Sequence, residues 1–289
     1  MILIDTHCHI HESDFPLDRS ETLAAAQAAG VEKIICVGTN MTSSRDVVNF
    51  AKNHNCHPER SEGSLRNTGD SSSTTQNDKV HIFAIIGIHP HEAQNSLADS
   101  FAGPGPAKEL ESILAGPGPA KEIVGVGEIG LDYFYEYSPR EAQIEILNQQ
   151  IELALKYDLP INFHVRDAFD DFWPIFDGFG GKIRGVLHSY TDNIANMEKA
   201  LTRGLFIGVN GIATFNREPD LLAVHKKLPL DRMLLETDAP YLAPVPFRGR
   251  PNQPSYIPKI VEFLSELRGE TPARIAKQTT ANAEKLFHI

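Results

Sequence analysis

The sequence predicts a single α/β domain, a (β/α)8 TIM barrel, and three observations lead to this fold class. Eight short runs rich in β-branched residues recur along the chain, helical patterns separate them, and 289 residues suffice for one barrel. Eight such alternating units favour closure over an open, doubly wound sheet. The expected strands are residues 2–5, 33–37, 80–87, 123–126, 160–164, 185–188, 205–209 and 232–236.

The helices between these strands are indicated by apolar residues on one face and by recognisable ends. Ser20 can cap a first helix that stops at Gly30. Thr271 and Pro272 are typical of the start of the last helix. The apolar stripes of the remaining helices are Ile144, Leu147, Ile151, Ala154 and Leu155, then Ile194, Met197 and Leu201, then Ile257, Ile260, Val261, Leu264 and Leu267.

Two segments interrupt the alternation, and we expect both to be inserts into the domain 1–289 without catalytic roles. Residues 55–79 contain almost no apolar side chain except Leu65, so they bury too little surface to offset the entropy of ordering, and we expect disorder. Within 102–122 the sequence Ala-Gly-Pro-Gly-Pro-Ala-Lys-Glu occurs twice, too few copies for a solenoid. A metal site in the first insert is disfavoured, because no second ligand cluster accompanies His54, Cys56 and His57.

Composition limits the classes of function. Apolar residues make up 41% of the chain, yet no run approaches the roughly 20 residues of a membrane span. Asp5 and His7 interrupt the first apolar run, so no signal peptide is expected, and three irregularly spaced cysteines fit a reducing cytoplasm. The formal net charge of −11 disfavours wide electrostatic binding of nucleic acid. It does not exclude an enzyme that meets phosphates through bound cations.

Histidines and carboxylates recur at the predicted strand ends. His7 and His9 close the first strand, where positions i and i+2 point to the same side, and histidine is the commonest metal ligand. In a (β/α)8 barrel the carboxyl ends of all strands meet at one face, so distant residues converge there. Similar residues, namely Glu128, His164, His188 and Asp238, lie near the ends of strands 4, 5, 6 and 8.

Six ligands with one shared carboxylate suit two divalent cations about 3.5–4 Å apart. Any one of these residues alone could be a buried, hydrogen-bonded polar group. Their joint occurrence indicates a metal centre, and imidazole-rich sites favour zinc, manganese or cobalt, whereas cellular availability favours magnesium. The first cation is assigned to His7, His9, Glu128 and Asp238, and the second to Glu128, His164 and His188.

Residues 125–130 match the Gly-x-Gly-x-x-Gly dinucleotide fingerprint, but this interpretation is disfavoured. The fingerprint needs a helix N-terminus at the phosphates, whereas a loop is expected from Leu131 until a helix near Pro139. Glu128 would also place a negative charge in the phosphate site. We expect these glycines to let the backbone turn around a metal-bound carboxylate.

Further residues near the strand ends are candidates for substrate binding. His89, which follows the third strand with His91, is either a loop histidine or a group that contacts a phosphate or protonates a leaving group. Arg166 and Arg248 suit bidentate phosphate contacts, although arginines are more often solvated surface residues. Weaker candidates at the mouth are Tyr133, Asn210, Arg217 and Arg250.

Spaced motifs run through the chain in a fixed order. They are Asp5-Thr-His-Cys-His9, Gly87-Ile-His-Pro-His91, Gly127-Glu-Ile-Gly-Leu-Asp132, His164-Val-Arg166, His188-Ser-Tyr190, Leu235-Glu-Thr-Asp-Ala-Pro-Tyr-Leu242, Arg248-Gly-Arg-Pro-Asn-Gln-Pro254 and Thr280-Ala-Asn-Ala-Glu-Lys-Leu-Phe287. Together they resemble the TatD family of metal-dependent deoxyribonucleases, over the whole chain except 55–79 and the repeat region. One departure is Tyr190, where the family often has Phe.

The resemblance implies a cytoplasmic TIM-barrel hydrolase of the amidohydrolase superfamily that cleaves DNA phosphodiesters, often from a 3′ end. Its metal residues correspond to His7, His9, Glu128, His164, His188 and Asp238. The expected mechanism is attack by a metal-bridging hydroxide, with Glu128 bridging and Asp238 also taking the proton of the water. The expected substrate is DNA, single-stranded or at 3′ ends, with no membrane and no obligate protein partner.

Three alternatives remain open at this point. Amidohydrolases that open cyclic amides or deaminate bases share the His-x-His start, but many bridge their metals with a modified lysine on strand 4, where this chain has Glu128. A D-aminoacyl-tRNA deacylase can resemble TatD proteins in fold and ligands, and the sequence does not separate the two. A non-catalytic metal-binding protein would hold metal without turning over a phosphodiester.

Overall fold

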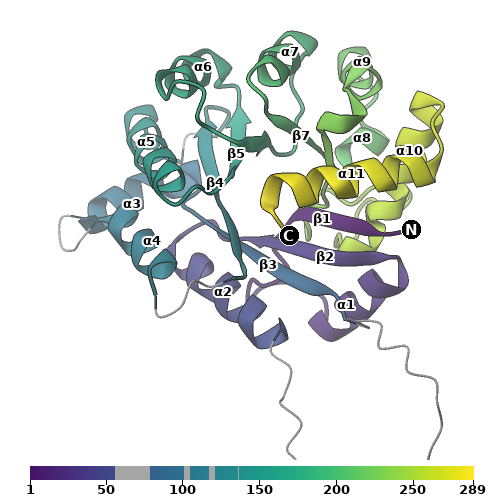
Figure 1. Cartoon of the computed structure of the whole chain (residues 1–289), viewed down its shortest axis with the longest axis horizontal. Helices are drawn as coiled ribbons and strands as arrows, with labels where there is room; N and C mark the ends of the chain where they lie inside the picture. The colour runs from purple at the N-terminus through teal and green to yellow at the C-terminus, as the bar shows by residue number, and fades with distance from the viewer. Residues whose placement is uncertain (56–78, 101–104, 117–120, 136) are drawn as a thin grey trace, which may run out of the picture.

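The computed structural model describes residues 1–55, 79–100, 105–116, 121–135 and 137–289. Within these ranges eight strands lie in chain order in one sheet, each parallel to the next, which confirms the predicted barrel (Figure 1). The strands are β1 (Leu3–Cys8), β2 (Val31–Val37), β3 (His81–Ile86), β4 (Ile123–Asp132), β5 (Ile161–Arg166), β6 (Gly185–Leu187), β7 (Phe206–Val209) and β8 (Met233–Leu235).

The sheet closes where the segment after β8 meets β1. Cys8 forms a parallel bridge with Ala239, and the amide of Asp238 donates to the carbonyl of His7 at 2.8 Å. The Thr6 hydroxyl donates to the carbonyl of Leu235 at 3.0 Å. The chain that carries Asp238 is thereby attached to the strand that carries His7.

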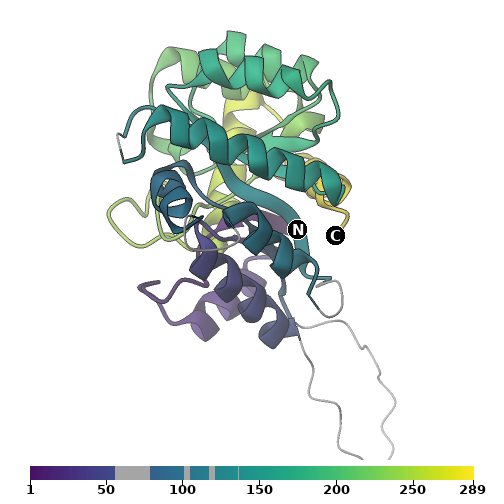
Figure 2. The ribbon, with the colours of Figure 1, turned by 90° about the vertical axis from the view of Figure 1, so that its left-hand side faces the viewer.

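Helices surround the strands, and in Figure 2 the loops after β4 and β8 project from one end, while both termini lie at the other. None of the helices in the described ranges has the length and apolar character needed to cross a bilayer. The helices are α1 (Arg19–Ala28), α2 (Met41–Asn55), α3 (Ala93–Ser100), α4 (Pro106–Leu114), α5 (Arg140–Lys156), α6 (Phe169–Gly178), α7 (Ile194–Thr202), α8 (Ile212–Phe215), α9 (Pro219–Lys227), α10 (Ile257–Arg268) and α11 (Pro272–Phe287), with short 3-10 turns at Pro90–Glu92, Leu230–Arg232 and Pro254–Tyr256.

Inside the barrel an apolar layer lies below a polar one. Val186, Phe206 and Leu234 pack together with the end of α11 at Leu286 and Phe287. Two residues further along, on β7 or directly after β6 and β8, lie Gly208, His188 and Glu236, which face the same way because positions two apart share a face. A Cβ on Gly208 would lie 2.4 Å from Glu236 Oε2, so the glycine leaves the space that the carboxylate occupies.

Two expectations about β4 were wrong. The strand does not end at residue 126 but continues to Asp132, so Glu128 lies within the strand. The glycines do not form a turn: at Gly130, with φ of +153°, a Cβ would lie 1.8 Å from the carbonyl oxygen of His164. Glycine is needed because β4 and β5 approach closely there. The helix after β4 begins only at Arg140, which agrees with the argument against a dinucleotide site.

Helix ends follow the expected capping chemistry with one correction. Asp18, not Ser20, caps α1, because its carboxylate accepts the amide of Glu21 at 2.9 Å. Thr271 caps α11 as predicted, accepting the amide of Arg274 at 3.3 Å. Sequence alone could not choose between two neighbouring polar residues that both favour the cap position.

The expected inserts fall largely outside the described residues, and their character stays a prediction. Cys56 and His57 lie outside the described ranges, while His54 Nε2 lies 3.0 Å from the carbonyl oxygen of Val80. Within 102–122, part of the first repeat copy begins α4, whose Leu110 is fully buried in the outer core.

Candidate metal centre

Glu128 lies at the centre of a cluster of histidines at the carboxyl ends of the strands. Its Oε1 is 2.8 Å from His164 Nδ1 and 2.9 Å from His188 Nε2. Its Oε2 is 3.4 Å from His7 Nε2 and 3.9 Å from His9 Nε2. The two oxygens of one carboxylate therefore face two separate histidine pairs, one at the end of β1 and one at the ends of β5 and β6.

Asp238 completes the first group. Its Oδ1 lies 3.4 Å from His9 Nε2 and 3.7 Å from His7 Nε2, and these two nitrogens are 3.1 Å apart. Asp238 adopts φ of +59°, a left-handed conformation that directs the chain back after β8. All six predicted ligand residues thus come together at one rim of the barrel.

The tautomers of His7 and His9 are determined by the partner of the far ring nitrogen. His9 Nδ1 lies 2.8 Å from the carbonyl oxygen of Val37, which can only accept, so this nitrogen carries the hydrogen. His7 Nδ1 likewise faces the side-chain oxygen of Asn162 at 3.1 Å. In the neutral rings both Nε2 lone pairs point toward the carboxylates, so acceptor atoms gather with no donor between them. This donor set fits a divalent cation.

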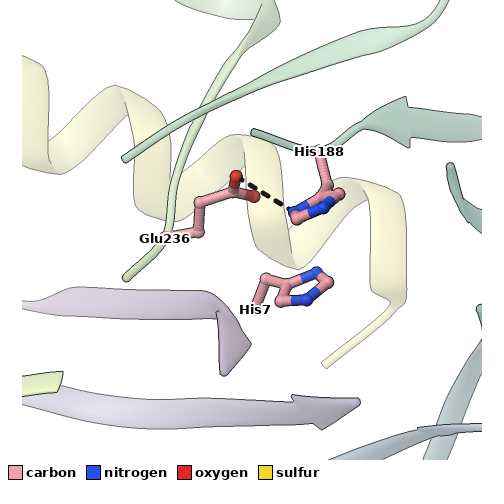
Figure 3. A group of neighbouring side chains, drawn as sticks. All are labelled: His7, His188 and Glu236. Atoms are coloured by element: carbon pink, nitrogen blue, oxygen red, sulfur yellow. Dashed lines mark ion pairs between the residues drawn. The ribbon is translucent and has the colours of Figure 1, made fainter. Parts of the chain in front are cut away.

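Two carboxylates that sequence analysis did not assign to the site lie behind the other two histidines. Asp132 Oδ2 accepts His164 Nε2 at 2.9 Å, which leaves Nδ1 as the lone-pair nitrogen toward Glu128. Glu236 Oε1 lies 3.5 Å from His188 Nδ1, and Figure 3 shows this pair above the ring of His7. Asp132 lies four positions after Glu128 on β4, and Glu236 lies two positions before Asp238 just past β8, so a period-two signal could have identified both acids.

His89 differs from the other four rings. Its Nδ1 accepts the backbone N–H of His91 at 3.2 Å, so in the neutral ring the hydrogen is on Nε2. That Nε2 lies 3.4 Å from Glu128 Oε1. His89 therefore presents a donor to the cluster, where the others present lone pairs. Together with Glu128 and His164 it forms one of the groups with metal-ligand spacing, but its tautomer is that of a donor.

The electrostatics of the cluster are dominated by its carboxylates. Burial would raise the pKa of Glu128, but the imidazoles of His188 and His89 lower it well below its usual range. Burial also opposes ionisation of Asp238, yet its hydrogen bond with His9 holds its pKa below normal. The same Asp238 overcomes the effect of burial on His9 and raises the pKa of that ring to about 9. Two ionised, buried carboxylates need positive charge beside them.

A cavity of about 1000 Å³ opens onto the cluster and reaches the predicted arginines. Arg166 holds its guanidinium 3.7 Å above the ring of Phe134. Arg248 lies 3.7 Å above Phe215 and donates to the carbonyl of Ala243 at 3.0 Å. In the described part of the chain neither arginine has a carboxylate partner, so both can offer N–H groups to an anion in the cavity.

Comparison with known proteins identifies the family. Residues 4–288 match the family described as TatD related DNase. This chain belongs to the TatD family. Among TatD relatives, the 3'-5' ssDNA/RNA exonuclease TatD of Citrobacter rodentium is 32% identical over 295 residues, covering 99% of this chain and 98% of that protein. The uncharacterized metal-dependent hydrolase YabD of Bacillus subtilis is 31% identical over the full length of both chains.

Solved structures agree with the TatD assignment. A crystal structure of a TatD homologue from Escherichia coli superposes with a TM-score of 0.82 at 30% identity, covering 99% of this chain and 98% of the other. A TatD family hydrolase from Entamoeba histolytica has the same fold, with a TM-score of 0.78 at 21% identity. The chain is therefore a metal-dependent hydrolase, which confirms the predicted class of enzyme.

Proposed function

We propose that this TatD protein hydrolyses phosphodiester bonds in single-stranded DNA, removing nucleotides from the 3′ end, with two divalent cations. One observation carries the proposal: the two oxygens of Glu128 face separate histidine pairs, 2.8–2.9 Å on one side and 3.4–3.9 Å on the other. A carboxylate that serves two neighbouring cations needs this division. The relatives named as ssDNA/RNA exonucleases support a nucleic-acid substrate.

The six predicted residues are assigned as ligands in two groups. His7, His9 and Asp238 would hold one cation, His164 and His188 would hold the other, and Glu128 would serve both. When bound, divalent cations polarise a phosphoryl oxygen and lower the pKa of water toward roughly 7. The protein contributes the spacing of the two groups and the orientation of each ring.

The remaining residues act on substrate and protons. Arg166 and Arg248, which have no carboxylate partner among the described residues, bind phosphate oxygens of the strand through their guanidinium groups. His89 donates its Nε2 hydrogen to an oxygen of the scissile phosphate. Asp238 accepts the proton of the attacking water, because its side chain is 15% exposed whereas that of Glu128 is 6% exposed.

A binding mode of this kind is compatible with the net charge of −11. Attraction of the polyanion is local, confined to the metal centre and two arginines, so affinity for long nucleic acid is modest. We also propose that the protein works in the cytoplasm. The free thiols of Cys8 and Cys36, whose sulfurs are 3.8 Å apart, support a reducing compartment.

The test uses purified protein with 5′-labelled single-stranded DNA, and in parallel with D-aminoacyl-tRNA, in Mg²⁺, Mn²⁺, Co²⁺ or Zn²⁺ or with chelator. We expect a ladder that shortens from the 3′ end and disappears with chelator. An RNA strand of the same sequence, cleaved under the same conditions, measures whether the enzyme prefers deoxyribose or ribose. Release of the D-amino acid with the DNA left intact would overturn the nuclease proposal and establish the deacylase alternative.

A further inference from the structure

Aromatic rings are exposed at the mouth of the cavity, immediately after β4. Phe134, Tyr135 and Tyr137 are 53%, 38% and 65% exposed, which is unusual for side chains that favour burial. Tyr135 and Tyr137 line the cavity, and their rings are nearly parallel, with centroids 5.4 Å apart and planes 14° apart. We call these two rings the stacking platform.

The stacking platform is held by side chains that belong to the site. His91 contacts Tyr137 and Tyr135 edge to face, with centroids 4.7 Å and 5.4 Å apart. The guanidinium of Arg166 lies 4.9 Å from the centroid of Tyr135. Apolar surface that is fixed in place beside a cation and open to a cavity is typical of a binding surface.

Asp132 connects the stacking platform to the candidate metal centre. Its Oδ1 accepts the backbone amides of Phe134 and Tyr135, both at 3.0 Å. Its Oδ2 accepts His164 Nε2 and His91 Nε2, both at 2.9 Å. One buried carboxylate therefore positions a metal-facing histidine and the aromatic turn together, so the two surfaces have a defined relative position.

We propose that Tyr135 and Tyr137 form a subsite that stacks an unpaired nucleobase of the strand being cleaved, while Arg166 binds a backbone phosphate of that strand. This inference rests on the proposed function and adds the part of the substrate that is recognised. Every base has a π face, so stacking tolerates any sequence but requires that the base is unpaired. The occupant is a single-stranded end: its charge complements Arg166, and the platform is continuous with the cavity.

The test compares three versions of each platform residue. Tyr135→Leu and Tyr137→Leu keep apolar bulk and remove the π face, while Tyr135→Phe and Tyr137→Phe keep the ring and are the matched controls. Because no hydrogen bond from either hydroxyl is present in the described part of the chain, the Phe variants keep the stacking surface, and their KM should lie well below that of the Leu variants. Substrates are 5′-labelled single strands that carry either normal nucleotides or an abasic site at one of the last three positions.

A stacked base away from the scissile bond binds equally well in the ground state and in the transition state. Loss of stacking should therefore raise KM and leave kcat nearly unchanged. Each Leu variant should raise KM by roughly tenfold with kcat nearly unchanged. An abasic site at the stacked position should raise the KM of wild type similarly and leave that of the Leu variants unaltered. In chelator, a strand with 2-aminopurine at that position should lose fluorescence on binding wild type or Phe variants, and not on binding Leu variants.

The inference is overturned if Leu variants keep the wild-type KM, if abasic strands are cleaved with the wild-type KM at every position, or if 2-aminopurine is not quenched. It is also overturned if the Leu substitutions change only the sedimentation of the protein, since the rings would then form a contact between copies. Failure of the proposed function is a separate outcome: no strand is cleaved in any metal, whatever the platform variant.

Discussion

At the scale of single residues, the role of each histidine depends on the atom behind its ring. Where the outer ring nitrogen contacts an acceptor, the inner nitrogen of the neutral ring offers its lone pair to the cluster. His9 does so with the carbonyl oxygen of Val37 on its outer side, and His164 with the carboxylate of Asp132. In His89 the Nδ1 atom accepts the amide of His91, so the Nε2 atom of the neutral ring carries a hydrogen that points to the cluster. Histidines of similar sequence context thus divide into candidate ligands and a candidate donor.

This distinction predicts how substitutions of His89 behave. His89→Ala should lower kcat/KM on single-stranded DNA by about 100-fold, because a preorganised donor to the phosphate is lost. His89→Gln, whose amide can still donate, should recover part of that loss. Both variants should bind as much Mn²⁺ as wild type by electron paramagnetic resonance, whereas His7→Ala should not. Loss of bound metal in His89→Gln would instead make His89 a ligand.

His225 on α9 gives a prediction about pH and stability. Both of its ring nitrogens are buried without a hydrogen-bond partner among the described residues, and burial with Arg268 nearby lowers its pKa to about 4. Between this value and the usual pKa of roughly 6.5, the unfolded chain binds the proton and the folded chain does not, so the free energy of unfolding falls as pH decreases from 6.5 to 4.

Urea unfolding in chelator at pH 7.5 and pH 5 measures this effect. The free energy of unfolding of wild type should fall between pH 7.5 and pH 5, and about 2 kcal/mol of this fall should come from His225. That part should be absent in His225→Leu. Comparing the two proteins cancels the other titrating groups, including His11, whose pKa burial lowers to about 3. Equal losses in wild type and His225→Leu would show that this ring is not the cause.

At the scale of elements, a glycine on β7 leaves room for the acid that follows β8. Gly208 leaves space for Glu236, which in turn lies 3.5 Å from His188, the first residue after β6. Three neighbouring strands thus meet at one point: β7 contributes the space at Gly208, and the residues that directly follow β8 and β6 contribute the carboxylate and the ring. A carboxylate that lies behind a metal-ligating histidine fixes the orientation of the ring and raises the basicity of the ligating nitrogen.

Gly208→Ala should therefore weaken the metal centre. Its Cβ would lie 2.4 Å from Glu236 Oε2 and displace the carboxylate, so we expect about tenfold weaker Mn²⁺ binding and a loss of about 1–3 kcal/mol in unfolding free energy. Gly178→Ala is the matched control, because a Cβ there meets nothing within 4 Å. Titration calorimetry that finds the same affinity in both variants would rule out this role for Gly208.

At the scale of the whole molecule, the barrel brings its acids together from strands that are far apart in the chain. Glu128, Asp238 and Glu236 are all at or near one rim, and the histidines between them carry the compensating charge when protons are available. A bound cation supplies that charge to the folded state alone, since the unfolded chain does not assemble the site.

Metal binding should therefore raise the thermal stability of the whole domain. Adding 1 mM MnCl₂ to chelator-treated protein should increase Tm by about 5 °C, the size expected for ligand at roughly 100 times its Kd in a chain of this length. Glu128→Ala should abolish both the shift and turnover, whereas the surface variant Glu262→Ala should keep both. An equal shift in Glu128→Ala by scanning calorimetry would place the cation elsewhere.

By itself the sequence determined the fold class and the six residues at the rim. Both follow from local patterns: short apolar runs specify strands, and the ligand-type residues lie near the predicted strand ends, which a parallel barrel must gather at one face. This reasoning placed Glu128 after its strand, because the extent of β4 depends on how closely β5 can approach.

Only the tertiary structure decided how those residues face one another. The division of the Glu128 oxygens, the acids behind His164 and His188, and the donor tautomer of His89 all depend on atoms from different strands or loops. Such contacts are set by the register and approach of neighbouring strands, which no local pattern encodes. The physical reason is that a ring nitrogen takes its role from whichever atom folding brings to its far side.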